Sequence, residues 1–421
     1  SIIKSGNICI PLDPRIEKDN YRFISDLTEP DMIFATPDIL KRLNINEEKS
    51  ITPDSLDKID LDPYKENKLS DKDDYEKCAE IIFTSGSTGE PKGVMISHKN
   101  LIANTKSIVE YLELNESDRM LVVLPFYYCY GLSLLHTHLR VGGSIVFNNS
   151  FIFLGKIIDD LLKFKCTGFA GVPSHFQILL RKSDSFKKTE FPDLRYVTQA
   201  GGKLATVFIR EFRENQPNVR FIVMYGQTEA TARLSYITPE DFDTHEGSMG
   251  KGIPYVDLKV MNEKMEEVKP GEIGEIMAKG DNVMMGYYKD PELTAATLKD
   301  GWLHTGDLAT VDEDGFIYVK ARKKEIIKVG GKRVSPKEIE EVILQIPEVV
   351  DCSLSGVEDE LLGETLKAKM TVSTDIENKA FEEKVKQHCS EHLAMFKIPQ
   401  IFEISNSMTI SATGKKKINS Q

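Results

Sequence analysis

Up to about residue 257, short apolar runs alternate with longer amphipathic stretches. In the longer stretches, apolar residues recur every three or four positions, as in Leu204, Phe208 and Phe212, which is typical of a helix with one buried face. The short runs have the length of buried strands and occupy residues 120–124, 145–147, 168–172, 196–198 and 221–224. This alternation predicts an α/β domain with a mainly parallel sheet flanked by helices and with ligands at the carboxyl ends of the strands.

From residue 258 the pattern changes to short strands separated by turns that contain glycine. These strands are predicted at 258–261, 274–278 and 316–319, the last one after the turn Asp312–Gly315. The change predicts a small β-rich subdomain at about residues 255–320.

The last hundred or so residues predict a separate α+β domain. Ser335-Pro336-Lys337-Glu338 predicts a capping box with proline at the first helical position, opening a helix that buries Ile339 and Ile343. Further strands are expected at 349–355, 365–372 and 401–404, and a second helix at 380–389. We therefore expect two domains, residues 1–323 and 324–421.

Composition narrows the classes of function. With 421 residues the chain can form two or more domains, and 54 basic minus 66 acidic residues give a net charge of -12. This acidity argues against a nucleic-acid or anionic-membrane partner, and no apolar run is long enough for a membrane span. The six cysteines show no C-x-x-C spacing, which favours free thiols in a reducing cytoplasm.

The segment Thr84–Gly93, Thr-Ser-Gly-Ser-Thr-Gly-Glu-Pro-Lys-Gly, directly follows the apolar run 81–83. Its glycines allow backbone N–H groups to converge, its hydroxyls donate hydrogen bonds and its lysine adds a positive charge, so the segment suits a polyphosphate. An exposed flexible turn is the alternative interpretation. The segment is not the common G-x-x-x-x-G-K-[ST] loop, because Pro91 replaces the second glycine and Gly93 replaces the Ser or Thr that would hold magnesium.

This segment resembles the phosphate loop of the adenylate-forming superfamily, which includes acyl-CoA synthetases. Further motifs follow in the order of that family, namely Tyr225–Glu229, Trp302–Asp307, Arg322–Glu340 and Gly414-Lys415. The resemblance implies that residues 1–323 form the AMP-binding domain and that 324–421 form a mobile lid domain with its hinge at Lys324. It also implies that the chain starts inside the family's large domain, so that an N-terminal part of this domain is absent.

The resemblance implies a role for each motif in holding the nucleotide. The phosphate-binding residues would be Thr84, Ser85, Gly86, Ser87, Thr88, Gly89 and Lys92. In the motif Tyr225-Gly226-Gln227-Thr228-Glu229, the tyrosine would stack on adenine and the glutamate would hold Mg²⁺. A tyrosine that only packs in the core is the alternative for Tyr225. Gly201 and Gly202 would pass close to adenine, Asp307 would bind the ribose hydroxyls, and Arg322 would reach the ribose or a phosphate.

Two lysines of the C-terminal segment are implied to act in the chemistry. Lys415 would bring its ammonium between the substrate carboxylate and the α-phosphate, where charge builds up in the transition state. Lys328, with Gly330-Gly331, would belong to a second face of the same domain that leaves room for a pantetheine arm. Outside the resemblance, Lys415–Lys417 would be a solvated run of charge.

The segment Pro125–Gly131, Pro-Phe-Tyr-Tyr-Cys-Tyr-Gly, resembles the acyl pocket of acyl-CoA synthetases, with Tyr128 at its aromatic position. Amino-acid-activating relatives have an aspartate at the next position, where it pairs with the substrate's ammonium group, and here that residue is Cys129. Because an unpaired buried ammonium is costly, we expect a carboxylic acid without an α-amino group.

These expectations imply ATP-dependent activation of a carboxylic acid to an acyl adenylate, with pyrophosphate release, followed by thioester formation with coenzyme A. Mg²⁺ would be the metal and coenzyme A a co-substrate. The alternatives are a ligase that loads a separate carrier protein, and a nucleotide-binding homologue without turnover.

Three other classes have weaker support in the sequence. The pair His136 and His138 could suggest a metal, but no further ligand cluster accompanies it, which favours ordinary core or surface histidines. The sequence contains no G-x-S-x-G, so a serine hydrolase is disfavoured. The basic stretches 320–324 and 415–417 could mark an RNA-binding module, which the acidic chain as a whole disfavours.

Overall fold

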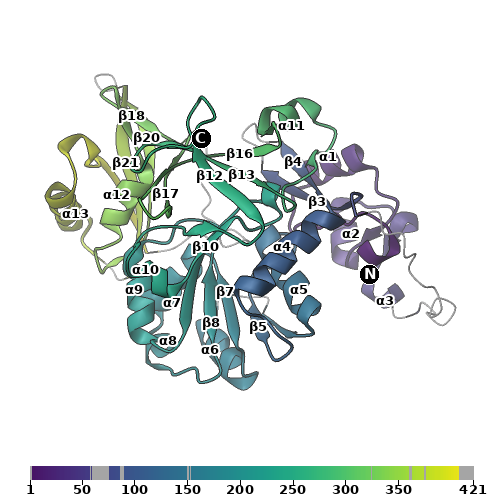
Figure 1. The fold of residues 1–421 in the computed structure, drawn as a ribbon. Helices are drawn as coiled ribbons and strands as arrows, with labels where there is room; N and C mark the ends of the chain where they lie inside the picture. Colours follow the sequence, from purple (N-terminus) through teal and green to yellow (C-terminus); the bar gives the residue numbers. More distant parts are fainter. Residues whose placement is uncertain are drawn as a thin grey trace. The chain divides into compact units, whose positions relative to one another are not determined.

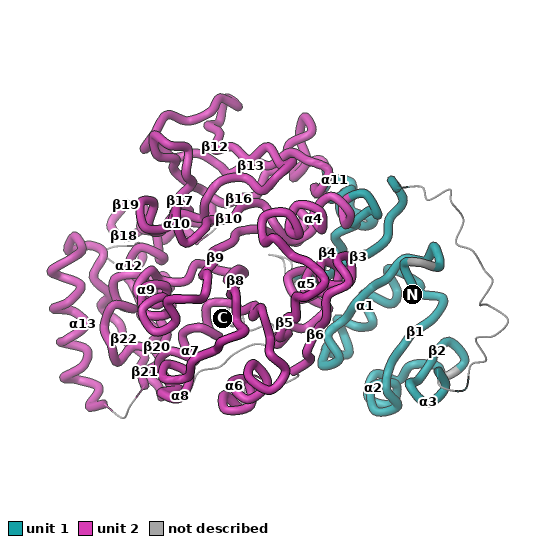
Figure 2. The backbone as a smooth tube through the Cα atoms, turned by 60° about the horizontal axis from the view of Figure 1, so that its bottom comes forward, with its two compact units in different colours: residues 1–99, 284–294 teal, residues 100–283, 295–421 magenta. Residues whose placement is uncertain are grey.

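The computed structural model describes residues 2–56, 58, 75–85, 90–148, 151, 153–323, 325–359, 363–373 and 376–406. The chain forms two compact units (Figure 2). Unit 1 contains residues 1–99 and 284–294, and unit 2 contains residues 100–283 and 295–421.

Unit 1 is organised around a three-stranded sheet in the order β14-β4-β3. Its strands are β3 (Cys78–Ser85), β4 (Pro91–Ser97) and β14 (Gly286–Tyr287), and all pairings are antiparallel. The remaining elements are η1 (Ile3–Ser5), α1 (Lys18–Thr28), α2 (Pro37–Leu43), η2 (Glu47–Lys49), α3 (Pro53–Leu56) and the parallel pair β1 (Ile33–Phe34) and β2 (Ser50–Ile51). The hairpin β3–β4 is a finding of the structure, because the sequence pattern indicated only the first of these two strands.

The centre of unit 2 is a seven-stranded sheet in the order β11-β10-β9-β8-β7-β5-β6. Its strands are β5 (Arg119–Val122), β6 (Ser144–Phe147), β7 (Gly168–Gly171), β8 (Tyr196–Gln199), β9 (Arg220–Tyr225), β10 (Ser235–Ile237) and β11 (Lys251–Gly252). The five strands from β5 to β9 pair in parallel, and β10 and β11 extend one edge antiparallel. The predicted mainly parallel sheet is confirmed.

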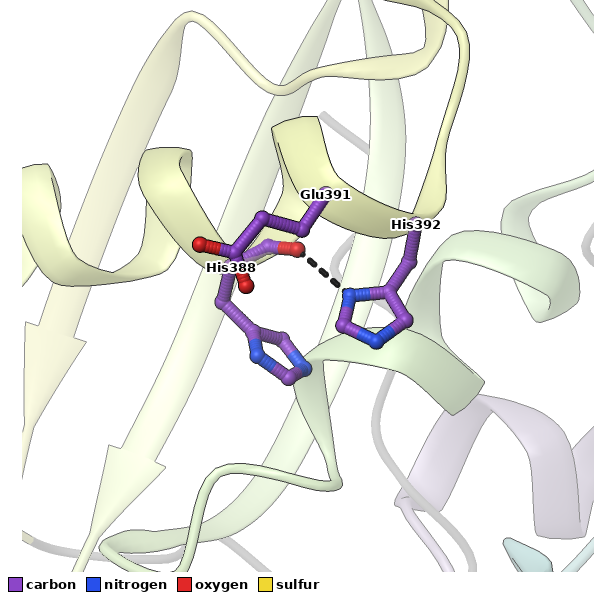
Figure 3. A group of neighbouring side chains, drawn as sticks. All are labelled: His388, Glu391 and His392. Carbon is purple, nitrogen blue, oxygen red and sulfur yellow. Dashed lines mark hydrogen bonds between the residues drawn. The ribbon is translucent and has the colours of Figure 1, made fainter.

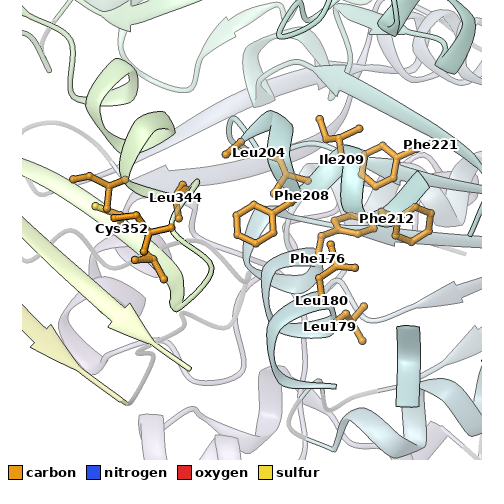
Figure 4. Packing of buried hydrophobic residues seen from close by; sticks show 14 of the residues in the cluster. Phe176, Leu179, Leu180, Leu204, Phe208, Ile209, Phe212, Phe221, Leu344 and Cys352 are labelled. Atoms are coloured by element: carbon orange, nitrogen blue, oxygen red, sulfur yellow. The ribbon is translucent and has the colours of Figure 1, made fainter. Parts of the chain in front are cut away.

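Alternate residues of these strands pack on opposite faces of the sheet. Leu121, Phe169 and Phe221 face a cluster shared with α6 to α9, part of which Figure 4 shows. Met120 and Ile222 face a second cluster shared with α4 and α5. The helices are α4 (His98–Tyr111), α5 (Cys129–Val141), α6 (Leu154–Lys163), α7 (Pro173–Lys182), α8 (Asp184–Lys188), α9 (Thr206–Asn215) and α10 (Pro239–Phe242). Helices on both faces keep the strands buried, as parallel sheets require.

A second sheet of unit 2 lies in the segment predicted as β-rich. It has the order β12-β13-β16-β15, and β17 pairs with β16. The strands are β12 (Val256–Met261), β13 (Gly274–Gly280), β15 (Leu298–Lys299), β16 (Trp302–Val311) and β17 (Ile317–Arg322), and α11 (Pro291–Thr297) precedes β15. The described strands of this sheet are all antiparallel.

The C-terminal segment forms the predicted α+β arrangement (Figure 1). Its elements are β18 (Ile327–Val329), β19 (Lys332–Val334), α12 (Pro336–Ile343), β20 (Val349–Asp359), β21 (Gly363–Val372), α13 (Asn378–His392), η5 (Met395–Lys397) and β22 (Ile401–Ser405). The predicted capping box is wrong: Pro336 does occupy the first turn, but the Ser335 side chain makes no capping bond and donates instead to the Lys320 carbonyl. Glu338 pairs with Lys397 rather than turning back to the start of its own helix.

Glu341 of α12 contacts the start of α9 within unit 2. Its Oε1 accepts hydrogen bonds from the backbone N–H of Thr206 at 2.7 Å and from the Thr206 hydroxyl at 2.8 Å, and its Oε2 lies 2.9 Å from Lys203 Nζ. Burial raises the pKa of the Glu341 carboxyl, but the charge of Lys203 and the bonds to Thr206 outweigh this effect and hold it below the ordinary glutamate value. A carboxylate therefore satisfies an open N–H at the first turn of α9.

Truncating Phe176 to alanine should destabilise unit 2. Phe176 is 0% exposed and its ring packs against Phe169, Phe212 and Phe221. Loss of such a side chain typically costs about 3–5 kcal/mol of unfolding free energy, which a urea titration followed by fluorescence will measure. The matched control is Phe153→Ala, because Phe153 is 66% exposed and should change the midpoint little. Equal midpoints for both variants would contradict this account of the core.

Candidate active site

Three residues of the predicted nucleotide site lie together in unit 2. Two of them, Tyr225 and Arg322, donate hydrogen bonds to the carboxylate of the third, Asp307. The Tyr225 hydroxyl donates to Asp307 Oδ2 at 2.6 Å, and Arg322 Nε donates to Asp307 Oδ1 at 2.9 Å. Asp307 on β16 and Arg322 on β17 are register partners, while Tyr225 ends β9 of the parallel sheet. The cluster thus connects the parallel sheet with the β-rich sheet.

The neighbouring charges in this cluster keep Tyr225 and Arg322 protonated. Burial and the neighbouring Asp307 carboxylate raise the pKa of Tyr225 far above the ordinary tyrosine value, so its hydroxyl stays protonated and remains a donor. Burial lowers the pKa of Arg322, but the Asp307 charge outweighs it and raises the pKa above the usual arginine value. Asp307 is 5% exposed, and its two oxygens offer about four acceptor positions, of which these bonds use two. The carboxylate can therefore still accept bonds from a ligand hydroxyl.

A bulge in β16 places the Asp307 side chain. Glu275 of β13 pairs with Leu308 and Met277 pairs with His304, so Thr305, Gly306 and Asp307 all lie opposite the single residue Ile276. Thr305 Oγ1 donates to the Ile276 carbonyl at 2.7 Å and accepts from the Asp307 N–H at 3.2 Å. Gly306 has φ +76°, a left-handed conformation that favours glycine. The motif Thr-Gly-Asp is therefore needed for the geometry of the bulge.

Glu275 holds this bulge from the neighbouring strand and was not identified from the sequence. Its Oε1 accepts from the Gly306 N–H at 3.0 Å, and its Oε2 lies 2.8 Å from Lys323 Nζ and 3.2 Å from His304 Nδ1. Burial raises the pKa of Glu275, but its bonds to Lys323, His304 and Gly306 prevail and lower it below the ordinary glutamate value. The Lys323 N–H also donates to the Gly306 carbonyl at 3.0 Å.

The motif Tyr225–Glu229 begins at the last residue of β9 and continues into η4 (Thr228–Ala230), which lies in the connection to β10. Gly226 is required by close packing, because a Cβ there would lie 1.9 Å from the Ala232 carbonyl oxygen. Glu229 is half-buried within η4. The sequence assigned Gly226 to the nucleotide, whereas the structure explains it by the return of the chain beside it.

Thr228 connects this motif with the predicted acyl pocket. Its side chain is buried, and its hydroxyl lies 3.5 Å from the sulfur of Cys129, the first residue of α5. Behind Cys129, the Tyr130 hydroxyl donates to the Thr198 carbonyl at 2.9 Å. Gly131 admits no side chain, since a Cβ would lie 2.2 Å from the Pro125 carbonyl oxygen. The two motifs are thus adjacent within unit 2.

Gly201 and Gly202 follow β8 at the carboxyl edge of the parallel sheet. Gly201 has φ +85°, and the Gln199 side chain donates to the Gly202 carbonyl at 2.8 Å. Gln177 and Gln199 each keep a buried side-chain oxygen for which the described residues supply no hydrogen-bond partner. The two glycines lie where the fold class predicts a ligand.

The predicted phosphate loop belongs to unit 1, where it joins β3 and β4. Thr84 and Lys92 are register partners at the end of this hairpin, and both are half-buried. Gly93 lies under the Phe83 ring, where a Cβ would come within 3.1 Å of it. Gly86, Ser87, Thr88 and Gly89, and the side chain of Ser85, lie outside the described residues.

Of the two predicted lysines of the C-terminal segment, the structure describes only Lys328. Lys328 lies on β18, and its N–H donates to Glu364 Oε2 at 2.8 Å. Gly330 and Gly331 have φ +55° and +77°, so the turn between β18 and β19 itself requires them. Lys415 and Lys324, the predicted hinge residue, lie outside the described residues.

The pair His136 and His138 does not form a metal site among the described residues. His138 is buried, its Nδ1 lies 2.9 Å from the Leu134 carbonyl oxygen, and burial lowers its pKa below the ordinary histidine value. The interpretation of His138 as a core histidine is confirmed.

Known protein families and known proteins resemble this chain in sequence. The sequence profile of AMP-binding enzymes matches residues 1–288, and that of the AMP-binding enzyme C-terminal domain matches residues 338–415. The oxalate–CoA ligase of Arabidopsis thaliana is 33% identical over 338 residues, covering 80% of this chain and 65% of that protein. The long-chain-fatty-acid–CoA ligase of Salmonella typhimurium is 33% identical over 344 residues, covering 81% of this chain and 60% of that protein. The chain thus spans less than two thirds of the length of these relatives.

Solved structures support the fold assignment. ATP-bound MatB from Rhodopseudomonas palustris superposes with a TM-score of 0.87 at 27% identity, covering 99% of this chain and 84% of that one. The anthranilate CoA ligase AuaEII in complex with anthranoyl-AMP reaches a TM-score of 0.88 at 24% identity, covering 99% and 82%. The predicted fold class is confirmed. In the part of the chain that the structure describes, no helix is both long and apolar enough to cross a membrane.

Replacing Glu275 with glutamine should weaken AMP binding by about tenfold or more, because a hydrogen bond to a charged group is worth roughly 1.5–3 kcal/mol. The amide keeps the size of the side chain but removes the charge that holds Gly306 and Lys323. Isothermal titration with AMP measures the effect. The matched control is Glu272→Gln, three residues earlier and exposed. If both variants bind AMP as tightly as the parent chain, Glu275 does not position the Asp307 bulge.

Proposed function

The chain belongs to the family of AMP-binding enzymes, and on that premise we propose that it joins a carboxylic acid to coenzyme A in two steps. ATP first activates the acid to an acyl adenylate, releasing pyrophosphate, and the thiol of coenzyme A then displaces AMP. The observation that carries this proposal is the Asp307 cluster with Tyr225 and Arg322, since it offers a buried carboxylate, an aromatic ring and a cation at the carboxyl edge of a parallel sheet.

In the proposed complex, Asp307 accepts hydrogen bonds from the ribose hydroxyls at its remaining acceptor positions. Tyr225 is half-buried, so part of its ring can stack on adenine while its hydroxyl stays bound to Asp307. Gly201 and Gly202 let the backbone pass close to the base. Arg322 adds a positive charge on the ribose and phosphate side, its side chain being 55% exposed.

Glu229 would hold Mg²⁺, because a carboxylate oxygen is the hard ligand that this ion prefers. When bound, the ion neutralises charge on the phosphates. The β- and γ-phosphates would be held by the hydroxyls of Thr84, Ser85, Ser87 and Thr88, by N–H groups at Gly86 and Gly89, and by Lys92. Gly226, Gln227 and Thr228, which lie between Tyr225 and Glu229, would also bind the nucleotide.

In the first step, a carboxylate oxygen of the substrate attacks the α-phosphorus and the bond to pyrophosphate breaks. Two anions must meet in line, so a cation beside the bond being made stabilises the transition state more than the separated reactants. We assign this role to Lys415. In the second step, the coenzyme A sulfur attacks the acyl carbonyl and AMP leaves with the oxygen.

We assign the second step to another face of the C-terminal domain, which carries Lys328 and the turn Gly330-Gly331. We propose that the domain boundary lies between residues 323 and 324. Lys324 would then be the hinge between the AMP-binding domain and its lid. The contact of Glu341 with Thr206 and Lys203 would have to break in any rotation about this hinge.

The acyl substrate is proposed to be a carboxylic acid without an α-amino group. Cys129 occupies the place of the aspartate that would pair with an ammonium, and its buried sulfur already contacts the Thr228 hydroxyl. Tyr128 beside it is half-buried, and burial raises its pKa far above the ordinary value, so no phenolate is present to pair with an ammonium. Oxalate and long-chain fatty acids, for which these relatives are named, are substrates of those proteins.

Coenzyme A is the proposed acceptor, and a separate carrier protein is the second candidate. A nucleotide-binding homologue without turnover is the third. We propose a cytoplasmic location, since all six cysteines are free thiols, as a reducing compartment would keep them. No nucleic-acid partner is proposed for this acidic chain.

The exchange of labelled pyrophosphate into ATP tests the first step. We expect exchange that depends on a carboxylic acid and falls by at least about 100-fold in Lys415→Ala, since removing one group that stabilises transition-state charge costs this much in other enzymes. Lys416→Ala, the adjacent lysine, is the matched control and should keep its activity. AMP binding without acid-dependent exchange would instead favour the homologue without turnover.

A panel of acids tests the choice of substrate. Aliphatic, aromatic and hydroxy acids should support pyrophosphate exchange, whereas the matching α-amino acids should support at least about tenfold less, because the pocket leaves their ammonium unpaired. Mass spectrometry of the products with and without coenzyme A identifies the acceptor. Preferred activation of an α-amino acid would contradict the role given to Cys129.

A further inference from the structure

The last turns of α13 carry the sequence His388-Cys389-Ser390-Glu391-His392. Residues three and four positions apart lie on the same face of a helix, so His388, Glu391 and His392 are neighbours. Figure 3 shows their three side chains on one side of α13. Cys389 is 0% exposed and belongs to the core, so it is not part of this face.

The three side chains are close enough to share one ion. One ligand atom from each of them lies within 4.8 Å of the others. The two imidazole rings have their centroids 4.5 Å apart and are inclined by 38°. Glu391 and His392 are exposed and His388 is half-buried, so water can reach the group.

Backbone carbonyls already orient both histidines. His388 Nε2 lies 3.1 Å from the Val342 carbonyl oxygen, and His392 Nδ1 lies 2.8 Å from the His388 carbonyl oxygen (Figure 3). A ring nitrogen that donates to a carbonyl leaves the other nitrogen unprotonated in the neutral ring, as is usual for histidines that bind metals. The χ2 angle of histidine is broad and roughly two-fold, so a ring can turn about its Cβ–Cγ bond without moving the helix.

We propose that His388, Glu391 and His392 form a binding site for one divalent transition-metal ion, such as Zn²⁺, Ni²⁺ or Cu²⁺. Imidazole suits these ions, whereas Mg²⁺ and Ca²⁺ prefer ligand sets made of oxygen atoms. Three protein ligands on an exposed face leave further coordination positions to water. This site is separate from the Mg²⁺ assigned to Glu229, since the two share no residue.

A purely structural role accounts for only part of the cluster. Val342 lies in the last turn of α12, and a histidine that binds one of the last carbonyls stabilises a helix end. That contact explains His388. It does not explain why a carboxylate and a second imidazole occupy the same face one turn further, where Glu391 Oε1 accepts from the Gln387 side chain and His392 Nδ1 lies beside the His388 carbonyl, both within α13.

The test uses the full chain, freed of any polyhistidine tag and of bound metal by a chelator. Zn²⁺ and Ni²⁺ are titrated by calorimetry, and Cu²⁺ binding is followed by its electron paramagnetic resonance spectrum, which reports nitrogen ligands. Removing a direct ligand should cost more than the roughly 10- to 100-fold lost when an outer-shell partner is removed. We therefore expect one saturable site in the parent chain and a loss of at least about tenfold in affinity in His392→Ala and in Glu391→Ala.

Ser390→Ala is the matched control, because Ser390 is exposed on the same turn and donates only to the Gln387 carbonyl. Circular dichroism of each variant checks that the overall secondary structure is kept. The proposal is overturned if the parent chain shows no saturable binding, or if His392→Ala and Ser390→Ala bind metal equally well. A Cu²⁺ spectrum without nitrogen ligands would overturn it too.

Discussion

The candidate site depends on one carboxylate held almost out of water. A buried charge is tolerated only when neighbouring donors replace its lost hydration, and Asp307 has Tyr225 and Arg322 in that role. Removing either donor would leave the carboxylate partly unpaired, and removing the carboxylate would leave a buried phenol and a cation without it. The cluster is therefore held as a unit.

The backbone around Asp307 explains why the cluster needs a specific sequence. Three residues of β16 lie opposite one residue of β13, and the side chains of Thr305 and Glu275 satisfy the N–H groups that this bulge removes from the ladder. Glu275 also contacts Lys323, the last described residue before the proposed hinge. The same carboxylate thus supports both the Asp307 bulge and the start of the proposed hinge segment.

Much of the fold could be predicted because apolar periodicity is a local property. The strands β5 to β9 and the helix α9 follow from short runs and spacing alone. The strand β4 was missed, because its pairing with β3 and with the distant Gly286–Tyr287 is not visible in a local window. Ser335 and Glu338 satisfy the pattern of a capping box, yet partners far along the chain, Lys320 and Lys397, take their side chains instead.

The resemblance to a known family named Asp307, Arg322 and Tyr225, and the structure brings these three residues together. The role of Glu275 could not be predicted from the sequence. A glutamate at a polar position of an alternating strand pattern is usually interpreted as a solvent-facing residue. The only local signal was the repeat Gly271-Glu272-Ile273-Gly274-Glu275-Ile276, whose two glutamates have opposite exposure. Gly226 was assigned to the ligand, although the return of the chain at Ala232 already requires it.

The most direct test of the central claim is a cycle of four binding measurements, with AMP and 2′,3′-dideoxy-AMP against the parent chain and Asp307→Asn. If Asp307 binds the ribose hydroxyls, the parent chain binds AMP more tightly than the dideoxy compound, and this difference largely disappears in Asp307→Asn. If Asp307→Asn keeps the full difference between the two ligands, the hydroxyls are bound elsewhere and the Asp307 cluster is not the nucleoside site.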